Sequence, residues 1–215
     1  MACRHKFHDY LTLEGIDYEP TTLIVGTFNP EWPEGNKAEW FYGRTHDEYS
    51  NQNNNFWEVL PRLYGLPSLI NATPFDWRKF CRNNSIAITD LIYSINDATE
   101  GNLEHEATLQ TYSDKAIAEK FNENVPVDIV GILEANPCIQ NIYLTRSASG
   151  KLWGKLWTPI RRYARIHQNI RIQPLITPSG YAYFQHGKWN KENPDNQIRR
   201  LADFVLMRWQ EVWHF

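Results

Sequence analysis

The sequence predicts an α/β fold of three layers, with a mostly parallel four-stranded sheet between two layers of helices. Short apolar runs of strand length alternate along the chain with longer segments whose apolar residues repeat every three or four positions. Hydrophobic residues make up 42% of the 215 residues, which excludes a disordered chain. This length suits one domain with a full core. We therefore expect residues 1–215 to form a single domain.

Four apolar runs are the expected strands, and they cover residues 21–26, 85–92, 139–144 and 170–176. Runs of this length that are rich in β-branched residues are typical of strands buried in parallel sheets. The first run ends at Gly26, and a polar loop is expected from residue 30 to residue 54.

Helices are predicted between the strands. They cover residues 56–64 and 151–166, with one or two more in residues 105–135, broken near 124–126. The last helix is expected to open with Asn193 as its cap and Pro194 in its first turn, because Ile198, Leu201 and Val205 follow at helical spacing. Such an alternation gives a parallel sheet covered on both faces, and its ligands bind at the carboxyl ends of the strands.

The composition narrows the class of protein. No apolar run is long enough to span a bilayer, and the first residues lack the apolar stretch of a secretory signal. Cys3, Cys81 and Cys138 are far apart and odd in number, which excludes a disulfide framework and a cysteine-based metal site. We expect a cytoplasmic monomer without a membrane partner, a metal or an organic cofactor.

Charge is distributed unevenly along the chain, although the formal net charge is only −3. Residues 135–191 contain nine Lys and Arg and no Asp or Glu, whereas the rest of the chain contains 13 basic and 25 acidic residues. This asymmetry favours one face that binds a polyanion. The alternative is a solvated helix on which basic residues happen to cluster.

Four short motifs follow one another at or between the expected strand ends. They are Gly26-Thr27-Phe28-Asn29-Pro30, Phe41-Tyr42-Gly43, Asn54-Asn55-Phe56-Trp57 and Thr177-Pro178-Ser179-Gly180. In this combination and order the chain resembles the uracil-DNA glycosylase superfamily, nearest the mismatch-specific uracil/thymine and hypoxanthine-DNA glycosylase branches. The resemblance spans roughly residues 20 to 185. It implies a uracil-DNA glycosylase-like fold.

The chain departs from the family pattern at three places. The first loop has one residue more than the usual Gly-x-Asn-Pro, Gly43-Arg44 stands where Ala-His is usual, and Thr177 stands where Asn or Ser is usual. If Asn29-Pro30 matches the family pair, Asn29 is the residue that orients water. If Gly26 is the anchor instead, Phe28 occupies the polar position and catalysis is in doubt.

The resemblance implies a monofunctional DNA glycosylase that flips out a deaminated base, uracil or hypoxanthine, and removes it by hydrolysis in base excision repair. No lysine stands at the motif positions to form a Schiff base, so strand cleavage is not expected. The alternative is a catalytically inactive, glycosylase-like protein that binds nucleic acid. An unrelated α/β hydrolase is disfavoured, because the chain has neither Gly-x-Ser-x-Gly nor a phosphate-binding loop.

The chemistry assigns roles to the motif residues. Cleaving the bond between base and sugar needs a positioned water, donors for the departing base and a dry pocket that receives the flipped base. The resemblance places catalysis at Asn29 and Thr27. It places base binding at Phe28, Phe41, Tyr42 and Asn54. A turn role for Asn29, core roles for the aromatic rings and a helix-cap role for Asn54 are the structural alternatives.

The expected partner is DNA, single- or double-stranded, that carries a damaged base; RNA is not excluded. Contacts with DNA are predicted for Thr177, Ser179, Gly180 and Tyr181, because small residues admit phosphates and an aromatic can enter the base stack. Lys151 and Lys155 are expected to neutralise phosphates. Should Asn29 not act, Glu31 and Asp47 are the next candidates, whereas a structural role is favoured for Asp90.

Overall fold

The computed structural model describes residues 1–44 and 54–215. Its main sheet contains β2 (Thr22–Gly26), β3 (Ile86–Asp90), β6 (Asn141–Leu144) and β7 (Arg171–Pro174). The strands are parallel and lie in the order β3-β2-β6-β7. Every residue of β2, β3 and β6 is buried, as expected for a sheet covered on both faces. The predicted four-stranded parallel sheet is confirmed, with strands one to three residues shorter than expected.

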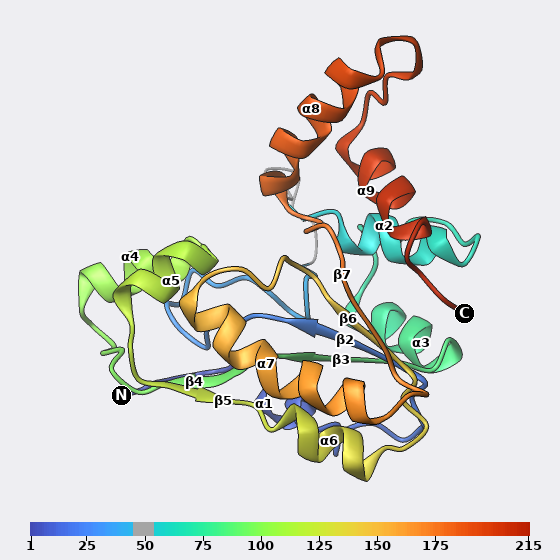
Figure 1. Ribbon diagram of the computed structural model, residues 1–215. Helices are drawn as coiled ribbons and strands as arrows, with labels where there is room; N and C mark the ends of the chain where they lie inside the picture. The colour runs from blue at the N-terminus through green and yellow to red at the C-terminus, as the bar shows by residue number, and fades with distance from the viewer. Residues whose placement is uncertain (45–53) are drawn as a thin grey trace.

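Helices form a layer on each face of this sheet (Figure 1). One layer contains α6 (Ile129–Ala135) and α7 (Lys151–Ile166), and the other contains α2 (Phe56–Leu63), α3 (Pro74–Asn83) and α9 (Leu201–Gln210). Trp153 and Trp157 of α7 are buried in the core. On the opposite face, the ring of Tyr143 from β6 stacks on Trp213, with centroids 4.2 Å apart. Aromatic residues therefore fill both sides of the sheet.

A second, three-stranded antiparallel sheet was not predicted. It contains β1 (Cys3–Arg4), β4 (Ile92–Ile95) and β5 (Asn124–Pro126), in the order β1-β4-β5. The sequence predicted one strand over residues 85–92, but the chain changes sheets at Leu91. The Leu91 amide donates to Gly26 of the main sheet, whereas its carbonyl accepts from Val127 beside the second sheet. An apolar run cannot reveal such a change, because both strands are buried.

The helices around residues 105–135 were only partly predicted. The break expected at 124–126 is strand β5, and the segment forms α4 (Leu103–Gln110), α5 (Asp114–Lys120) and α6. Figure 1 shows α4 and α5 side by side near the carboxyl ends of the main strands. Ser113 caps α5 by accepting a hydrogen bond from the Ala116 amide.

The C-terminal prediction was wrong in its boundaries. Pro194–Asn196 forms only a 3₁₀ turn, η2, and α9 begins at Leu201. The side chain of Asn190 accepts from the Ile198 amide and donates to the Ile198 carbonyl, which keeps Ile198 outside the helix. Residues 179–186, which follow the last expected strand, form η1 (Gly180–Ala182) and the start of α8 (Tyr183–Glu192). The N-terminal segment also contains the short helix α1 (His8–Leu11). A capping box formed by Thr73 and Asp76 stabilises the start of α3.

Within the described part of the chain, no helix combines the length and apolar character needed to cross a bilayer.

Candidate functional site

The candidate site lies at the carboxyl edge of the main sheet. Thr27 follows β2, and Thr145 and Arg146 follow β6. From β2 the chain proceeds to β3 on one side, whereas β6 lies on the other side of β2. Open parallel sheets bind ligands at such a topological switch point, outside the carboxyl ends of the strands. The region between the loops that follow β2 and β6 is therefore where a ligand is expected.

Asp90, the last residue of β3, forms a closed pair with His5. The His5 Nε2 atom lies 2.7 Å from Asp90 Oδ2, and the two side chains are 0% and 4% exposed. His5 Nδ1 accepts a hydrogen bond from the Phe7 amide at 3.0 Å, so Nε2 carries the proton that is donated to Asp90. Burial raises the pKa of Asp90, and the hydrogen bond from His5 opposes that rise. The pair links the N-terminal segment to the main sheet.

Tyr42 lies directly above the end of β2. Its hydroxyl hydrogen-bonds to the Thr145 hydroxyl at 2.8 Å. Its ring stacks on Phe56, with centroids 4.1 Å apart and an angle of 14° between the planes. A Cβ atom on Gly26 would collide with the Tyr42 hydroxyl and with Asp90 Oδ1, so only glycine fits there. Tyr42 is partly exposed, and it can present only the face that Phe56 does not cover.

Two residues predicted to bind the base belong instead to the core. Phe41 is fully buried, and Phe28 is buried beside it. Both rings pack around His5, with centroid distances of 5.5 Å and 5.8 Å respectively. This placement corrects the sequence-based assignment, because a ring closed on all sides offers no face to a base. The signal was ambiguous, since aromatic pairs beside a strand occur more often in cores than in sites.

Asn29 lies in the loop after β2, and its backbone is bound to the N-terminal segment. Its carbonyl accepts from the Lys6 amide at 2.8 Å, and Pro30 forms an isolated bridge with His5. The side chain behaves differently. Within the described residues Asn29 Oδ1 is buried without a hydrogen-bond partner. The fold therefore leaves this buried oxygen unsatisfied within the described residues, which is costly.

Asn54 and the loop after β7 form one connected structure. Asn54 Oδ1 accepts from the Phe56 amide at 2.9 Å, and its backbone forms an isolated bridge with Ser179. The hydroxyl groups of Thr177 and Ser179 lie 2.9 Å apart. Asn54 thus joins the start of α2 to this loop, and its side-chain oxygen is already engaged.

The residues predicted to contact DNA lie at or near the same edge. Gly180 and Tyr181 begin η1, and Tyr181 is 74% exposed with its hydroxyl 3.4 Å from Ser113 Oγ. Lys151 and Lys155 are exposed on the first half of α7, the helix that follows β6. Three arginines, Arg161, Arg162 and Arg165, surround a shallow hollow of about 210 Å³ on the last half of α7. The basic stretch therefore extends away from the edge rather than forming one compact face.

A second acid–base pair lies at this edge, and the sequence analysis missed it. Arg146 Nη1 lies 2.6 Å from Asp114 Oδ2, with the side chains 17% and 31% exposed. The Thr27 side chain lies close enough to Asp114 to lower the pKa of its carboxyl group. Burial raises the pKa of Asp114, and Arg146 opposes that rise. An Asp in the first turn of a helix is so ordinary that no local pattern marks it.

The remaining carboxylates named from the sequence contribute little to the described site. Glu31 is exposed, and its amide donates to Arg4 at 2.9 Å. Asp47 lies outside the described residues. In residues 1–44 and 54–215, no three His, Cys, Asp or Glu side chains gather as metal ligands would.

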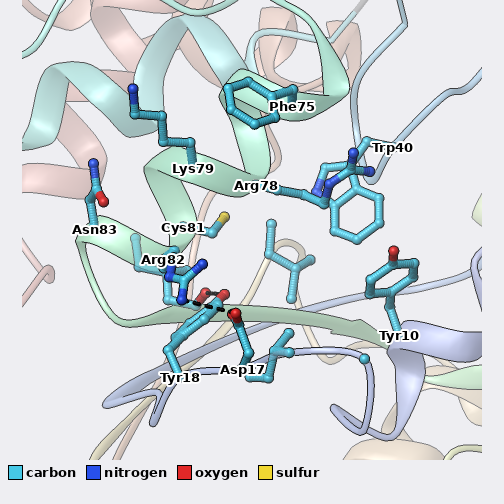
Figure 2. A pocket seen from close by; sticks show the side chains of 14 residues that line it. Tyr10, Asp17, Tyr18, Trp40, Phe75, Arg78, Lys79, Cys81, Arg82 and Asn83 are labelled. Carbon is cyan, nitrogen blue, oxygen red and sulfur yellow. Dashed lines mark hydrogen bonds and ion pairs between the residues drawn. The ribbon is translucent and has the colours of Figure 1, made fainter.

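A pocket of about 460 Å³ lies away from this edge, between α3 and the beginning of β3 (Figure 2). Its polar groups are largely paired with one another. Arg82 forms an ion pair with Asp17 at 2.9 Å, and the Arg78 guanidinium lies 5.4 Å from the centre of the Trp40 ring. None of the sequence motifs contributes to its lining.

Comparison with known proteins identifies the class of fold. No family model and no curated protein matches the sequence. The structure does match the solution structure of a protein from Methanosarcina acetivorans that is provisionally described as a uracil DNA glycosylase. The TM-score is 0.51 with 18% sequence identity, over 93% of this chain and 94% of that chain. The chain therefore has a uracil-DNA glycosylase-like α/β fold.

Proposed function

We propose that this protein is a monofunctional DNA glycosylase that flips out a deaminated base, uracil or hypoxanthine, and removes it by hydrolysis. The observation that carries the proposal is the Asn29 side chain. It lies in the loop after β2, beside the switch point of a glycosylase-like fold, and its buried oxygen has no partner in the described residues. A group that destabilises the fold in this way is typical of a functional site.

The proposed chemistry follows from the needs of the reaction. As the base leaves, positive charge develops on the sugar and negative charge on the base. Asn29 orients the attacking water through its amide. Tyr42 stacks on the flipped base with the face that Phe56 leaves uncovered, and the Asn54 amide nitrogen donates to the base.

DNA binding is assigned to the surroundings of this site. The loop from Thr177 to Tyr181 contacts the backbone beside the flipped nucleotide, with Ser179 and Gly180 admitting a phosphate. Lys151 and Lys155 neutralise phosphates further along the strand. The proposal places the protein in base excision repair.

A catalytically inactive protein of the same fold is the second candidate. One observation favours it. If Gly26 is the anchor of the first loop, Phe28 stands at the family's polar position, and Phe28 is buried. Such a protein would hold a flipped base without breaking the bond to its sugar.

One experiment separates the two candidates. Oligonucleotides that contain uracil, hypoxanthine or xanthine are incubated with the protein, as single strands and as duplexes, and are then treated with alkali. Breakage at uracil or hypoxanthine is expected. If no strand breaks although the same oligonucleotides bind in a gel-shift assay, the inactive binding protein is correct and the glycosylase proposal is wrong.

A further inference from the structure

The Asp114 carboxylate lies where the proposed reaction takes place. Asp114 begins α5, which the sequence places between the two strands β4 and β5 of the second sheet. Its contacts, however, reach the main sheet. Thr27, which follows β2, lies close enough to lower its pKa, and Arg146, which follows β6, forms the ion pair at 2.6 Å. The carboxylate thus lies near the two loops that border the switch point, and the loop after β6 holds it.

Asp114 differs from the other acidic groups described at this edge because it is both fixed by a partner and accessible to solvent. Asp90 is buried and accepts a hydrogen bond from His5 Nε2. Glu31 is exposed and no ion pair or side-chain hydrogen bond fixes it within the described residues. Asp114 is both held in place and 31% exposed at its side chain. It can therefore contact a water molecule without leaving its position.

We propose that Asp114 is the catalytic carboxylate of this protein, and that Arg146, its ion-pair partner, is its positioning residue. The inference rests on the glycosylase function proposed above and supplies what that function lacks. An amide such as that of Asn29 can hold a water molecule, but it cannot take a proton from it. Thr27 lies two residues before Asn29, so the two side chains start within about 7 Å of each other along the chain.

The proposed step balances as a hydrolysis. The bond between the sugar C1′ and the base nitrogen breaks, and its electron pair leaves with the base. The water oxygen forms a bond to C1′, and the proton that it loses passes to the Asp114 carboxylate. That proton then neutralises the base anion, so the products are the free base and an abasic site. Before the transfer, the negative charge of Asp114 also stabilises the positive charge that develops on the sugar.

Charged and titratable groups around Asp114 determine its protonation. Arg146 faces it from the loop after β6 and keeps the carboxylate ionised against the effect of burial, whereas Asp90 at the end of β3 raises its pKa. Tyr42 lies close enough to interact with both carboxylates, and its own pKa is raised well above the usual value by burial. Asp90 in turn is paired with His5. Activity should therefore rise with pH as Asp114 ionises.

The test measures single-turnover release of the base from a uracil- or hypoxanthine-containing duplex as a function of pH. Asp114→Asn keeps the size of the side chain but removes the charge and the basic group. We expect its rate to fall at least about 100-fold, with loss of the acidic limb of the pH profile and little change in DNA affinity. Arg146→Gln should retain a plateau within about tenfold of the wild type, with its acidic limb displaced to higher pH, because a cause that lowers the pKa of Asp114 is removed.

A matched control lies on the same helix. Glu119→Gln removes one negative charge from α5 at a side chain that is 67% exposed and paired only with Lys115 in the described residues. It should leave both rate and pH profile unchanged. Equal rates for Asp114→Asn and the wild type would overturn the role of Asp114 and leave the glycosylase proposal standing. The role of Asp114 would also be overturned if Asp114→Asn and Arg146→Gln lowered the rate equally and Arg146→Gln did not displace the acidic limb of the pH profile. A purely structural ion pair predicts that result. Absence of base release by the wild type would overturn both proposals.

Discussion

Two acid–base pairs lie at the carboxyl edge of the sheet, one on each side of β2. On the β3 side, His5 and Asp90 form a pair that is closed to solvent, with side chains 0% and 4% exposed. On the β6 side, Asp114 and Arg146 form a pair that solvent reaches, with side chains 31% and 17% exposed. The chemistry of the two pairs is similar, but their surroundings are not. A closed pair can contribute only to the fold, whereas an open pair can also contact a substrate.

The donors to the two carboxylates also differ. The Arg146 guanidinium is charged at every pH at which the protein is folded. His5 donates a hydrogen bond from Nε2 to Asp90, while its Nδ1 accepts from the Phe7 amide. Burial raises the pKa of both carboxyl groups. In the open pair, the charge of Arg146 therefore does not change with pH, which suits a catalytic carboxylate that acts in its ionised form.

The largest expected effect concerns the closed pair. His5→Ala should lower the free energy of unfolding by about 3–5 kcal/mol, because it leaves Asp90 buried without a partner. Urea denaturation of the two proteins measures the difference. Asp90→Asn is the control, and it should cost much less because its amide oxygen still accepts from Nε2. If His5→Ala is as mild as Asp90→Asn, the pair does not anchor the N-terminal segment.

The second prediction concerns Asn29, which lies in the loop after β2. Asn29→Ala should reduce the single-turnover rate about 100-fold, equivalent to about 2.7 kcal/mol in the barrier. It should not lower stability, because the oxygen that it removes is buried without a partner in the described residues. Rates and thermal unfolding are measured on the same preparation. Full activity of this variant would show that the Asn-Pro correspondence with the family is wrong.

The third prediction uses the two halves of α7 to locate the DNA. Replacing Lys151 and Lys155 by Glu should weaken binding to all DNA sequences alike. The slope of the logarithm of the binding constant against the logarithm of the salt concentration should decrease by about one unit for each phosphate that is no longer neutralised. Replacing Arg161 and Arg162 by Glu makes the same change of charge at the opposite end of the helix. Fluorescence anisotropy at several salt concentrations should separate the two variants. If the two double variants weaken DNA binding equally, DNA does not bind preferentially at the edge that contains Asp114 and Arg146.

The smallest expected effect concerns the stability of the open pair. Asp114→Asn should change the free energy of unfolding by no more than about 1 kcal/mol, since a solvent-accessible ion pair contributes little. The sign depends on pH. A carboxyl group whose pKa is raised on folding contributes stability below its ordinary pKa of 3.8, and this contribution is lost as pH rises through the raised value. The stability of the wild type relative to the variant should therefore decrease from pH 3.8 upward in a pH series of urea denaturation curves. An opposite trend would mean that Arg146 outweighs burial.

Local patterns in the sequence were sufficient to predict the main sheet, α7 and the edge at which the candidate site lies. Apolar runs and helical periodicity are local patterns, and α7 begins and ends at the predicted residues 151 and 166. Residues that follow parallel strands meet at one edge whatever the details of packing, so Thr27, Tyr42 and Ser179 could be assigned to that edge in advance. The burial of Phe28 and Phe41 could not, because the same rings suit a core and a binding platform equally well.

Which charged groups meet depends on the tertiary structure. His5 and Asp90 are 85 residues apart in the sequence, and Asp114 and Arg146 are 32 residues apart. Neither pair has a local signature, since an isolated histidine near the N-terminus and an aspartate in a first helical turn are both commonplace. The second sheet brings them together, because it fixes the N-terminal segment beside β4 and holds α5 near the ends of β2 and β6. Contacts of this range depend on how whole elements pack, which a local pattern of residues does not encode.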